Sequence, residues 1–407
     1  MMINGDVDRR FTRVRDEFER NFEERGEVGA AVCVTLDGET VVDLWAGQAD
    51  STTGRRWERD TAAVVFSTTK GMTALVAHLL QDRGLLSFDA PVATCWPEFA
   101  AAGKADLPVR MLLNHQAGLP AWRERLPDGA FYDWDLCVSL LAQQEPFWEP
   151  GTRVGYHSIA FGYLVGEVIR RVAGKSVGQV LAEEIAGPLG ADVWIGLPEQ
   201  IEPRVARSSY LAGPDTDAPF FRILAADPHS IQAQVAANTG GWFGDQEQLD
   251  SRASHAAEMP AVGGIATARG LATMYAPLCL DGAHDGVRIL SPDALPGLGR
   301  TESRIDIDTV LRIATTFTLG FMKSWDNRGL SEGTSMILGE QAFGHAGLGG
   351  SVGFADPGAR MSFGYVMNEH GPGTGLNRRG QSLVDAVYTS LGAVPTAGGY
   401  WAAAPRP

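Results

Sequence analysis

Ser67 and Lys70 stand three residues apart at the start of an apolar stretch, in the sequence Ser-Thr-Thr-Lys. Residues at this spacing share one face of an α-helix, so their side chains can meet. In the first turn, the positive end of the helix dipole favours a serine alkoxide. A buried lysine loses its proton readily and can act as the base that activates the serine. Because this short pattern often arises by chance, the hypothesis of a catalytic pair needs partners elsewhere in the chain.

Tyr156 and Ser158 form a second candidate group. They follow a Pro150-Gly151 turn and precede an apolar helical stretch, so Tyr156 is expected to project from a loop at a helix end. A tyrosine near a lysine ammonium can have a lowered phenol pKa and can accept or relay a proton. Ser158 is a candidate to hydrogen-bond the lysine and also a candidate N-cap of the following helix, and these two roles are compatible.

The third group is the glycine-rich segment His345-Ala-Gly347-Leu348, which continues into Gly349-Gly350. Glycines allow the backbone to approach a ligand and offer free N–H donors. The N–H groups of Ser67 and Leu348 are therefore candidates to bind the oxyanion of a tetrahedral intermediate. A hairpin that needs small residues at its entry would explain the same glycines without catalysis.

A further serine, Ser351, lies in a Gly-x-Ser-x-Gly pattern like the nucleophile elbow of α/β-hydrolases. That elbow requires a strand before it, a helix after it, and then an acid followed by a histidine. Here a strand is predicted after Ser351, and His370 is the sole later histidine. We therefore interpret Ser351 as a structural residue in a hairpin. Trp122 and Trp242 are candidates to line an acyl pocket, and core packing is their alternative interpretation.

Hydrophobic periodicity predicts the elements that would position these groups. Residues 28–36 and 40–45 predict a hairpin with its turn at Asp37-Gly38, and two late strands are predicted at 350–355 and 361–367. Polar stretches with Pro and Gly predict loops at 198–230 and 243–260. The predicted helices cover residues 11–24, 67–84, 136–143, 158–173, 268–280 and 379–391.

Strands near both ends of the chain, with helices between them, predict an α+β protein whose single antiparallel sheet is built from both termini. Residues 1–88 and 258–407 would form this sheet domain, and residues 89–257 would form an inserted helical domain. The cleft between the two domains is the expected place for a site.

In this order and setting, the three groups resemble the serine β-lactamase and penicillin-binding superfamily, above all class C β-lactamases and family VIII carboxylesterases. The stretch Met-Leu-Leu-Asn-His-Gln-Ala-Gly-Leu-Pro at 111–120 and the Gly-Gly-Ile-Ala-Thr at 263–267 also resemble family segments, and the likeness spans roughly residues 25–390. The resemblance implies a β-lactamase-like fold and an acyl-enzyme mechanism. It implies Ser67 as nucleophile, Lys70 as its partner in proton transfer and Tyr156 as proton shuttle, and it leaves open whether lysine or tyrosine is the primary base.

Two departures from the family pattern shift the expected substrate. His345 stands where a β-lactamase has the lysine of Lys-Thr-Gly, and a mostly neutral histidine holds a drug carboxylate less well at pH 7. Ser158 stands where β-lactamases have an asparagine that helps to position the substrate amide. With Gly347 as a supporting residue, these changes favour a small neutral carboxylic ester.

Composition excludes several other classes. The 407 residues carry 34 basic and 49 acidic side chains, a formal charge of −15, which argues against nucleic acid and anionic membrane as partners. No run approaches the roughly 20 apolar residues of a membrane helix, and the charged N-terminus lacks the apolar core of a secretory signal. The four cysteines form no Cys-x-x-Cys pair, so we expect free thiols, a cytoplasmic location, and no metal or cofactor.

Other activities remain open on the same residues. An acyltransferase, an amidase or D-peptidase and a weak β-lactamase would all use Ser67 as nucleophile. A protein that is acylated without turning over, or a structural relative, is the alternative outside enzymes. The intact set of Ser67, Lys70 and Tyr156 favours the enzyme.

Overall fold

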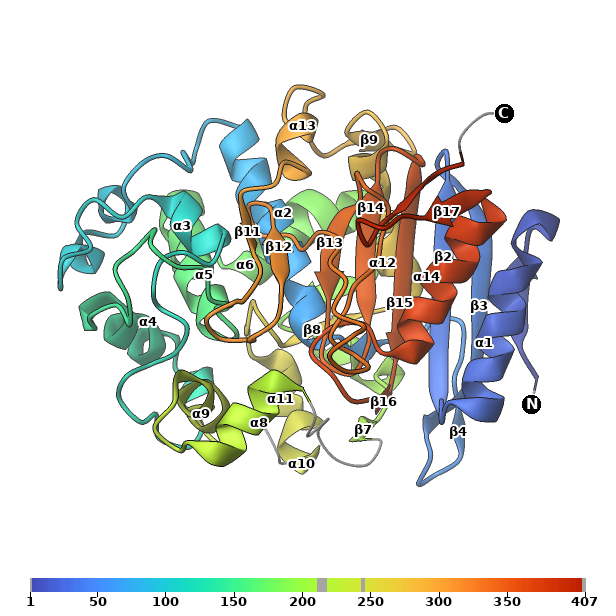
Figure 1. Ribbon diagram of the computed structural model, residues 1–407, viewed down its shortest axis with the longest axis horizontal. Coiled ribbons are helices and arrows are strands. Elements are labelled where there is room, and N and C mark those ends of the chain that lie inside the picture. The colour runs from blue at the N-terminus through green and yellow to red at the C-terminus, as the bar shows by residue number, and fades with distance from the viewer. Residues whose placement is uncertain (1, 211–217, 243–245, 405–407) are drawn as a thin grey trace.

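A computed structural model describes residues 2–210, 218–242 and 246–404. Its central sheet is antiparallel throughout and runs in the order β1-β3-β2-β15-β14-β13 (Figure 1). The sheet thus joins strands from both ends of the chain, as predicted. The strands are β1 (Asn4–Val7), β2 (Gly29–Leu36), β3 (Glu39–Asp50), β13 (Phe343–Ala346), β14 (Val352–Asp356) and β15 (Met361–Met367).

The predicted hairpin of β2 and β3 turns at Asp37 and Gly38. Both residues have positive φ, 51° and 86°. This is the two-residue turn whose twist matches that of the flanking strands, and Asp-Gly is a favoured sequence for it. Strand β1 was not predicted, and it extends the sheet by pairing with the outer edge of β3.

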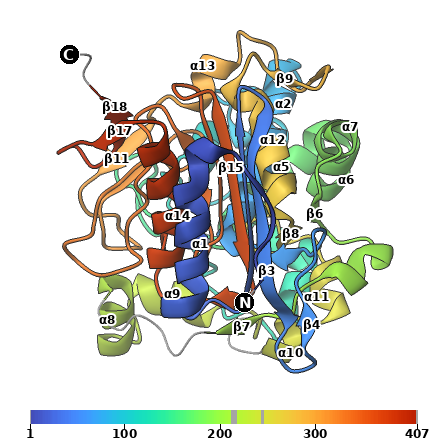
Figure 2. The ribbon, with the colours of Figure 1, turned by 90° about the vertical axis from the view of Figure 1, so that its right-hand side faces the viewer.

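Helices cover both faces of this sheet. Alternate residues of β2 divide between two apolar clusters: Val32 and Val34 face one side, whereas Ala31 and Cys33 face the other. Helices α1 (Thr12–Glu24) and α14 (Arg378–Ser390) lie side by side over the first face (Figure 2), and α12 (Ala268–Cys279) packs on the second. Burial on both faces explains why β15 is buried along its whole length.

Close contact between α12 and the sheet depends on glycine in β15. A Cβ atom added to Gly364 would lie 2.2 Å from the carbonyl oxygen of Ala268 in α12. Any side chain at this position would therefore push the helix away from the sheet. The approach matters for the site because α12 also supports α2, the helix that follows Ser67: a Cβ on Gly71 would lie 2.0 Å from the Tyr275 hydroxyl.

The remaining helices lie mainly to the left of the sheet in Figure 1. The predicted helices are present, with ends shifted by a few residues. The helices of this part are α2 (Thr69–Asp82), α3 (Val109–Leu113), α4 (Trp134–Gln143), α5 (Ala160–Ala173), α6 (Val177–Leu181), α7 (Gly187–Leu189), α8 (Pro219–Ala226), α9 (Ile231–Ala237), α10 (Gln246–Leu249), α11 (Arg252–Ala256) and α13 (Leu295–Leu298).

The loops predicted at 198–230 and 243–260 are wrong in part. Residues 219–226 form α8, and 246–249 and 252–256 form the short helices α10 and α11. Pro219 occupies the first turn of α8, where a missing N–H is harmless, so the proline that suggested a loop instead starts a helix. Residues 211–217 and 243–245 lie outside the described part.

Smaller sheets join distant segments. In a three-stranded sheet, β5-β8-β6, residues just before Ser67 pair with residues 264–266, which pair on their other side with residues 193–195. The proposed division into domains 1–88 with 258–407 and 89–257 stays a prediction. The short strands are β4 (Arg55–Arg56), β5 (Ala63–Val64), β6 (Val193–Ile195), β7 (Ser209–Tyr210), β8 (Gly264–Ala266), β9 (Ala283–His284), β10 (Val287–Arg288), β11 (Ser303–Ile305), β12 (Thr315–Phe317), β16 (Glu369–His370), β17 (Ala393–Pro395) and β18 (Trp401–Ala403).

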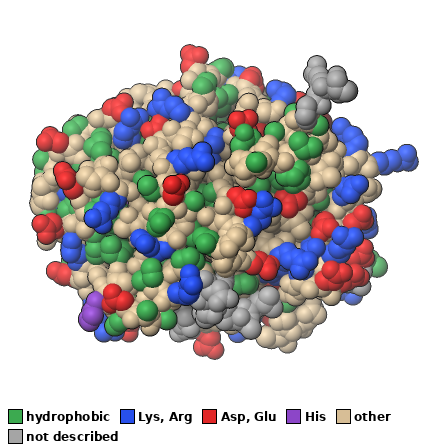
Figure 3. Space-filling model, viewed as in Figure 1, with side chains coloured by type: hydrophobic (Ala, Val, Ile, Leu, Met, Phe, Trp, Pro, Cys, Tyr) green, Lys and Arg blue, Asp and Glu red, His purple; other side chains and the backbone are tan. Residues whose placement is uncertain are grey.

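The surface in Figure 3 carries acidic and basic side chains intermingled over the whole visible face. Within the described ranges, no helix combines the length and the apolar character that crossing a lipid bilayer requires.

Candidate active site

Ser67 lies at the entrance of α2, in a short 3₁₀ turn (Phe66–Thr68) that leads directly into the helix. The preceding residue, Phe66, has φ of 43°, in the left-handed region that a bulky side chain rarely adopts. Such a backbone costs on the order of 1–3 kcal/mol and is common beside catalytic groups. Ser67 therefore sits where it was predicted, at the positive end of the helix dipole, and its side chain reaches the cavity described below.

Lys70 lies one turn further along α2 and is completely buried. Its Nζ donates to the hydroxyl of Ser67 at 3.1 Å and to the carbonyl of Ala261 at 3.0 Å. No carboxylate forms an ion pair with this nitrogen in the described structure. Burial therefore lowers the pKa of Lys70 well below its ordinary value. A lysine whose pKa is lowered by burial and whose nitrogen lies 3.1 Å from a serine hydroxyl is placed to exchange a proton with that hydroxyl.

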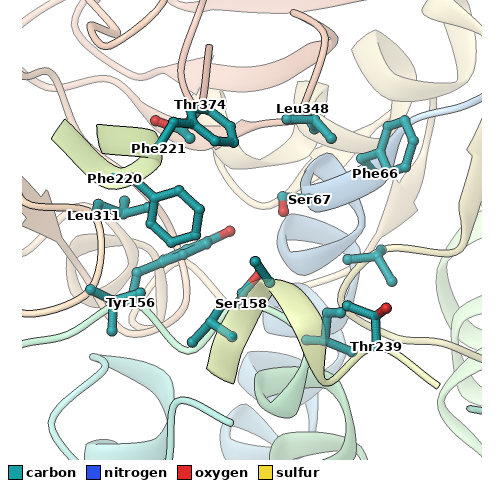
Figure 4. Close-up of a pocket in the computed structure, with 15 residues that line it drawn as sticks. Phe66, Ser67, Tyr156, Ser158, Phe220, Phe221, Thr239, Leu311, Leu348 and Thr374 are labelled. Carbon is teal, nitrogen blue, oxygen red and sulfur yellow. The ribbon is translucent and has the colours of Figure 1, made fainter. Parts of the chain in front are cut away.

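Tyr156 lies across the cavity from Ser67, and its hydroxyl points towards the serine (Figure 4). The Lys70 nitrogen lies over the Tyr156 ring, 4.9 Å from its centre. Burial raises the pKa of Tyr156, and the neighbouring Ser67 hydroxyl offsets only part of that rise. The expected lowering of this pKa by a lysine ammonium is not found, because the lysine itself is desolvated. The phenol thus keeps its proton at rest.

Leu348 lines the same cavity, on the segment between β13 and β14 (Figure 4). Its backbone N–H has no hydrogen-bond acceptor among the described residues, whereas Gly347 donates to Ser351 and Gly350 to Gly347. Gly347 itself is tightly packed, since a Cβ there would lie 2.1 Å from the carbonyl of Val65. Glycine at this position lets the segment approach the Ser67 turn and present the N–H of Leu348.

His345 lies behind the site rather than in the cavity wall. Its Nδ1 donates to the carbonyl of Ala346 at 2.7 Å, which leaves Nε2 as a buried acceptor without a partner in the described residues. Burial and the nearby Lys70 hold its pKa well below the ordinary value, so the ring is neutral. The position of a β-lactamase's fixed cation is thus occupied here by an uncharged group, 6.2 Å from the Tyr156 ring centre.

The cavity over Ser67 has a volume of about 220 Å³ and apolar walls. None of the described residues that line it carries a charge. Phe220 and Phe221 on α8 face Ser67 from the opposite side (Figure 4). Besides Ser67, Tyr156 and Leu348, the lining residues are Phe66, Ser158, Ile159, Phe220, Phe221, Val235, Ala236, Thr239, Val262, Val310, Leu311 and Thr374.

Sequence reasoning missed the walls supplied by α8, by α9 and by residues 310–311. The apolar sequence after Pro219, Phe-Phe-Arg-Ile-Leu, was the available signal for α8, and it was outweighed by the polar residues around it. For Val310 and Leu311 no local signal exists, because only the folded chain places them beside Tyr156.

Three other predicted residues have different surroundings from those expected. Trp122 and Trp242 do not line the cavity: both are buried, and their indole N–H groups donate to the Cys137 carbonyl and the Ser254 hydroxyl. Trp242 instead packs behind Phe66, with ring centres 6.0 Å apart. Ser158 lines the cavity but does not cap α5, whose N-cap is Ile159.

Ser351 has the buried, structural surroundings proposed for it. Its hydroxyl donates to the carbonyl of Val65 at 2.8 Å and lies 3.1 Å from the Thr68 hydroxyl. It thereby joins the start of β14 to the turn that carries Ser67. In the part of the chain that the structure describes, no three His, Cys, Asp or Glu side chains are grouped as metal ligands.

Comparison with known proteins agrees with this architecture. Esterase/beta-lactamase LipL of Mycobacterium tuberculosis (strain ATCC 25618 / H37Rv) is 36% identical over 391 residues, which covers 90% of this chain and 83% of that protein. A crystal structure of a family VIII carboxylesterase superposes with a TM-score of 0.85 at 39% identity, covering 96% of this chain and all of the other. A penicillin-binding protein homologue from Caulobacter crescentus superposes with a TM-score of 0.83 at 35% identity and the same coverage.

Together, the fold and these relatives define the class of the protein as a serine hydrolase. The chain belongs to the Beta-lactamase family, whose model matches residues 15–387. The predicted family resemblance and the predicted β-lactamase-like fold are both confirmed.

Proposed function

We propose that the protein is a serine carboxylesterase that hydrolyses small, uncharged carboxylic esters through an acyl-enzyme on Ser67. The observation that carries this proposal is the buried, unpaired Lys70 within 3.1 Å of the serine hydroxyl, below an apolar cavity without charged walls. The names of the relatives, an esterase/beta-lactamase and a family VIII carboxylesterase, agree with ester hydrolysis.

In the proposed acylation, neutral Lys70 accepts the Ser67 proton as Oγ attacks the ester carbonyl. The N–H groups of Ser67 and Leu348 bind the resulting oxyanion, at about 3–4 kcal/mol per donor. The carbon–oxygen bond to the alcohol then breaks, and Tyr156 gives its proton to the departing alkoxide. Tyr156 recovers a proton from the Lys70 ammonium, which restores both groups. The raised pKa of Tyr156 and the lowered pKa of Lys70 support this division of roles.

Deacylation repeats these steps with water in place of Ser67. Water loses its proton to the Lys70–Tyr156 pair as it attacks the acyl carbonyl, and Ser67 takes a proton as it leaves. Acyl transfer to an added alcohol would use the same intermediate, so product analysis with and without methanol separates a transferase from a hydrolase.

Simple esters are expected to be better substrates than β-lactams. A β-lactam carries a carboxylate, and neither the cavity lining nor neutral His345 offers that anion a cation. We expect kcat/KM for p-nitrophenyl butyrate to exceed that for nitrocefin by about 10- to 100-fold, since loss of one charged hydrogen bond is worth about 1.5–3 kcal/mol. Faster hydrolysis of nitrocefin would contradict the weight given to His345.

Phe221 is expected to limit the length of the acyl chain. With the ester carbon at Ser67, the acyl chain meets the wall formed by Phe220 and Phe221. Because each buried methylene is worth about 0.8 kcal/mol, Phe221→Ala should raise the octanoate-to-butyrate ratio of kcat/KM by about tenfold or more. Phe22→Ala on α1, which removes another half-buried phenylalanine outside the cavity, is the control and should leave the ratio unchanged. An unchanged ratio in Phe221→Ala would show that Phe221 does not limit the length of the acyl chain.

A further inference from the structure

Asp308 is a fully buried carboxylate with no cationic partner in the described parts of the chain. Burying an ionised carboxylate without an opposite charge is costly unless hydrogen bonds replace its water. Burial raises the pKa of Asp308 to about 6, although several backbone N–H groups act in the other direction. A group this unfavourable to bury points to a role beyond filling space.

The hydrogen bonds of Asp308 join two segments that are distant in sequence. Both carboxylate oxygens accept from the backbone N–H of Tyr156, each at 3.1 Å. Oδ1 also accepts from the N–H groups of Val310 and Leu311, both at 2.8 Å. Oδ2 lies 3.4 Å from the hydroxyl of Thr315. One carboxylate thus fixes the backbone of Tyr156 and folds the 308–311 segment against it.

All three residues that donate backbone N–H groups to Asp308 line the cavity over Ser67: Tyr156, Val310 and Leu311. A second contact extends the assembly to α9, because the Gln232 amide donates to the carbonyls of Thr309 and Val310. Val235 and Ala236 on that helix are also cavity residues. Asp308 therefore lies behind three parts of the cavity lining, namely Tyr156, residues 310–311 and α9, and does not line the cavity itself.

The position needs a carboxylate because all its close partners are donors. An asparagine keeps one acceptor oxygen, which can still serve Val310 and Leu311. Its NH₂ group, however, replaces the second acceptor beside the Tyr156 N–H, and two donors then face each other. An alanine leaves three buried N–H groups unsatisfied, which costs stability.

We propose that Asp308 is a positioning residue, which holds the Tyr156 hydroxyl at the distance from Ser67 needed to protonate the leaving alcohol. The proposal rests on the proposed function, in which Tyr156 supplies that proton. Asp308 acts through the Tyr156 backbone and contacts neither the substrate nor the reacting atoms.

Leaving-group dependence is the test, because it isolates protonation of the alcohol from the rest of catalysis. p-Nitrophenolate departs without a proton, whereas ethoxide is strongly basic and needs one. Tyr156→Phe should therefore lose much more kcat towards ethyl butyrate than towards p-nitrophenyl butyrate. Asp308→Ala should change this ratio in the same direction by tenfold or more, and Asp308→Asn should fall between Asp308→Ala and the wild type.

Asp356→Ala is a matched control. Asp356 is also buried, its Oδ1 accepts from the N–H groups two and three residues ahead, and its Oδ2 accepts from the Tyr388 hydroxyl. Asp356 stands at the far end of β14 from the Gly347–Ser351 segment. The Asp356→Ala variant should therefore be less stable but have an unchanged leaving-group ratio. Thermal unfolding of every variant measures that loss, and Asp308→Asn carries the test if Asp308→Ala does not fold.

Two unfavourable results can be told apart. Suppose that Tyr156→Phe shows the ratio change but that the Asp308 variants lose activity towards both esters equally. Asp308 is then only a structural residue, and the inference is overturned. If Tyr156→Phe itself leaves the ratio unchanged, the tyrosine is not the acid of the proposed mechanism. That result overturns both the role given to Tyr156 and the role of Asp308 behind it.

Discussion

Ser67→Ala is expected to reduce turnover of p-nitrophenyl butyrate by about 10⁵-fold or more, to near the rate without enzyme. Loss of the nucleophile removes the acyl-enzyme route altogether, and the remaining N–H donors can at most assist attack by water. Intact-protein mass after exposure to a fluorophosphonate should show one adduct on the wild type, located at Ser67 by peptide mapping. The alanine variant should show none.

Ser351→Ala is the matched control for this experiment, because Ser351 lies in the other sequence pattern typical of a nucleophile. Its hydroxyl is committed to Val65, so the variant should lose about 1 kcal/mol of stability and keep both the adduct and most turnover. Turnover by Ser67→Ala well above the uncatalysed rate would refute the proposed nucleophile. An adduct on Ser351 would do the same.

Lys70→Met is expected to lower kcat/KM by about 10²–10⁴-fold, the usual range for loss of a general base. Methionine fills similar space without an amine, so the cavity is retained while the proton acceptor is lost. In the wild type, activity should fall as the pH decreases, because protonated Lys70 cannot accept the Ser67 proton. Since burial lowers the pKa of Lys70, this fall should occur well below the ordinary lysine pKa of about 10.4.

Lys104→Met is the control for burial of a lysine. The Lys104 ammonium donates to the carbonyls of Ala101 and Gln144, away from the cavity, and burial lowers its pKa to about 8. This variant should be less stable yet keep the acidic limb of the wild-type pH profile. A Lys70→Met variant with wild-type activity would shift the role of base to another group.

Local sequence patterns predicted the parts of the site that depend on short-range geometry. Ser67 and Lys70 meet because three residues of helix bring them to one face, which needs no knowledge of the rest of the fold. The Asp37-Gly38 hairpin and the helix that follows Ser67 were predicted for the same reason. The family resemblance added Tyr156, whose distance in sequence from Ser67 gives no local signal.

Predictions based on residue type alone were less successful. Trp122 and Trp242 were predicted to line the cavity because they are large and aromatic. In the structure each indole N–H instead donates to a buried carbonyl or hydroxyl away from the cavity. Phe220 and Phe221 line the cavity instead. They lie on a helix that was predicted as a loop because of its polar neighbours and its proline. The type of a residue describes what it can pack against, whereas its neighbours in space decide what it does.

The sequence by itself determined the candidate nucleophile, the lysine beside it and the sheet built from both ends of the chain, because each follows from short-range periodicity or from motifs in fixed order. Only the tertiary structure decided the burial of Lys70, which lowers its pKa, and the shape of the cavity. The pKa of Lys70 is lowered because distant segments exclude water and place no carboxylate beside it. Tyr156 is fixed by Asp308, 152 residues further along the chain. Desolvation and long-range hydrogen bonds arise from packing, and no local pattern encodes them.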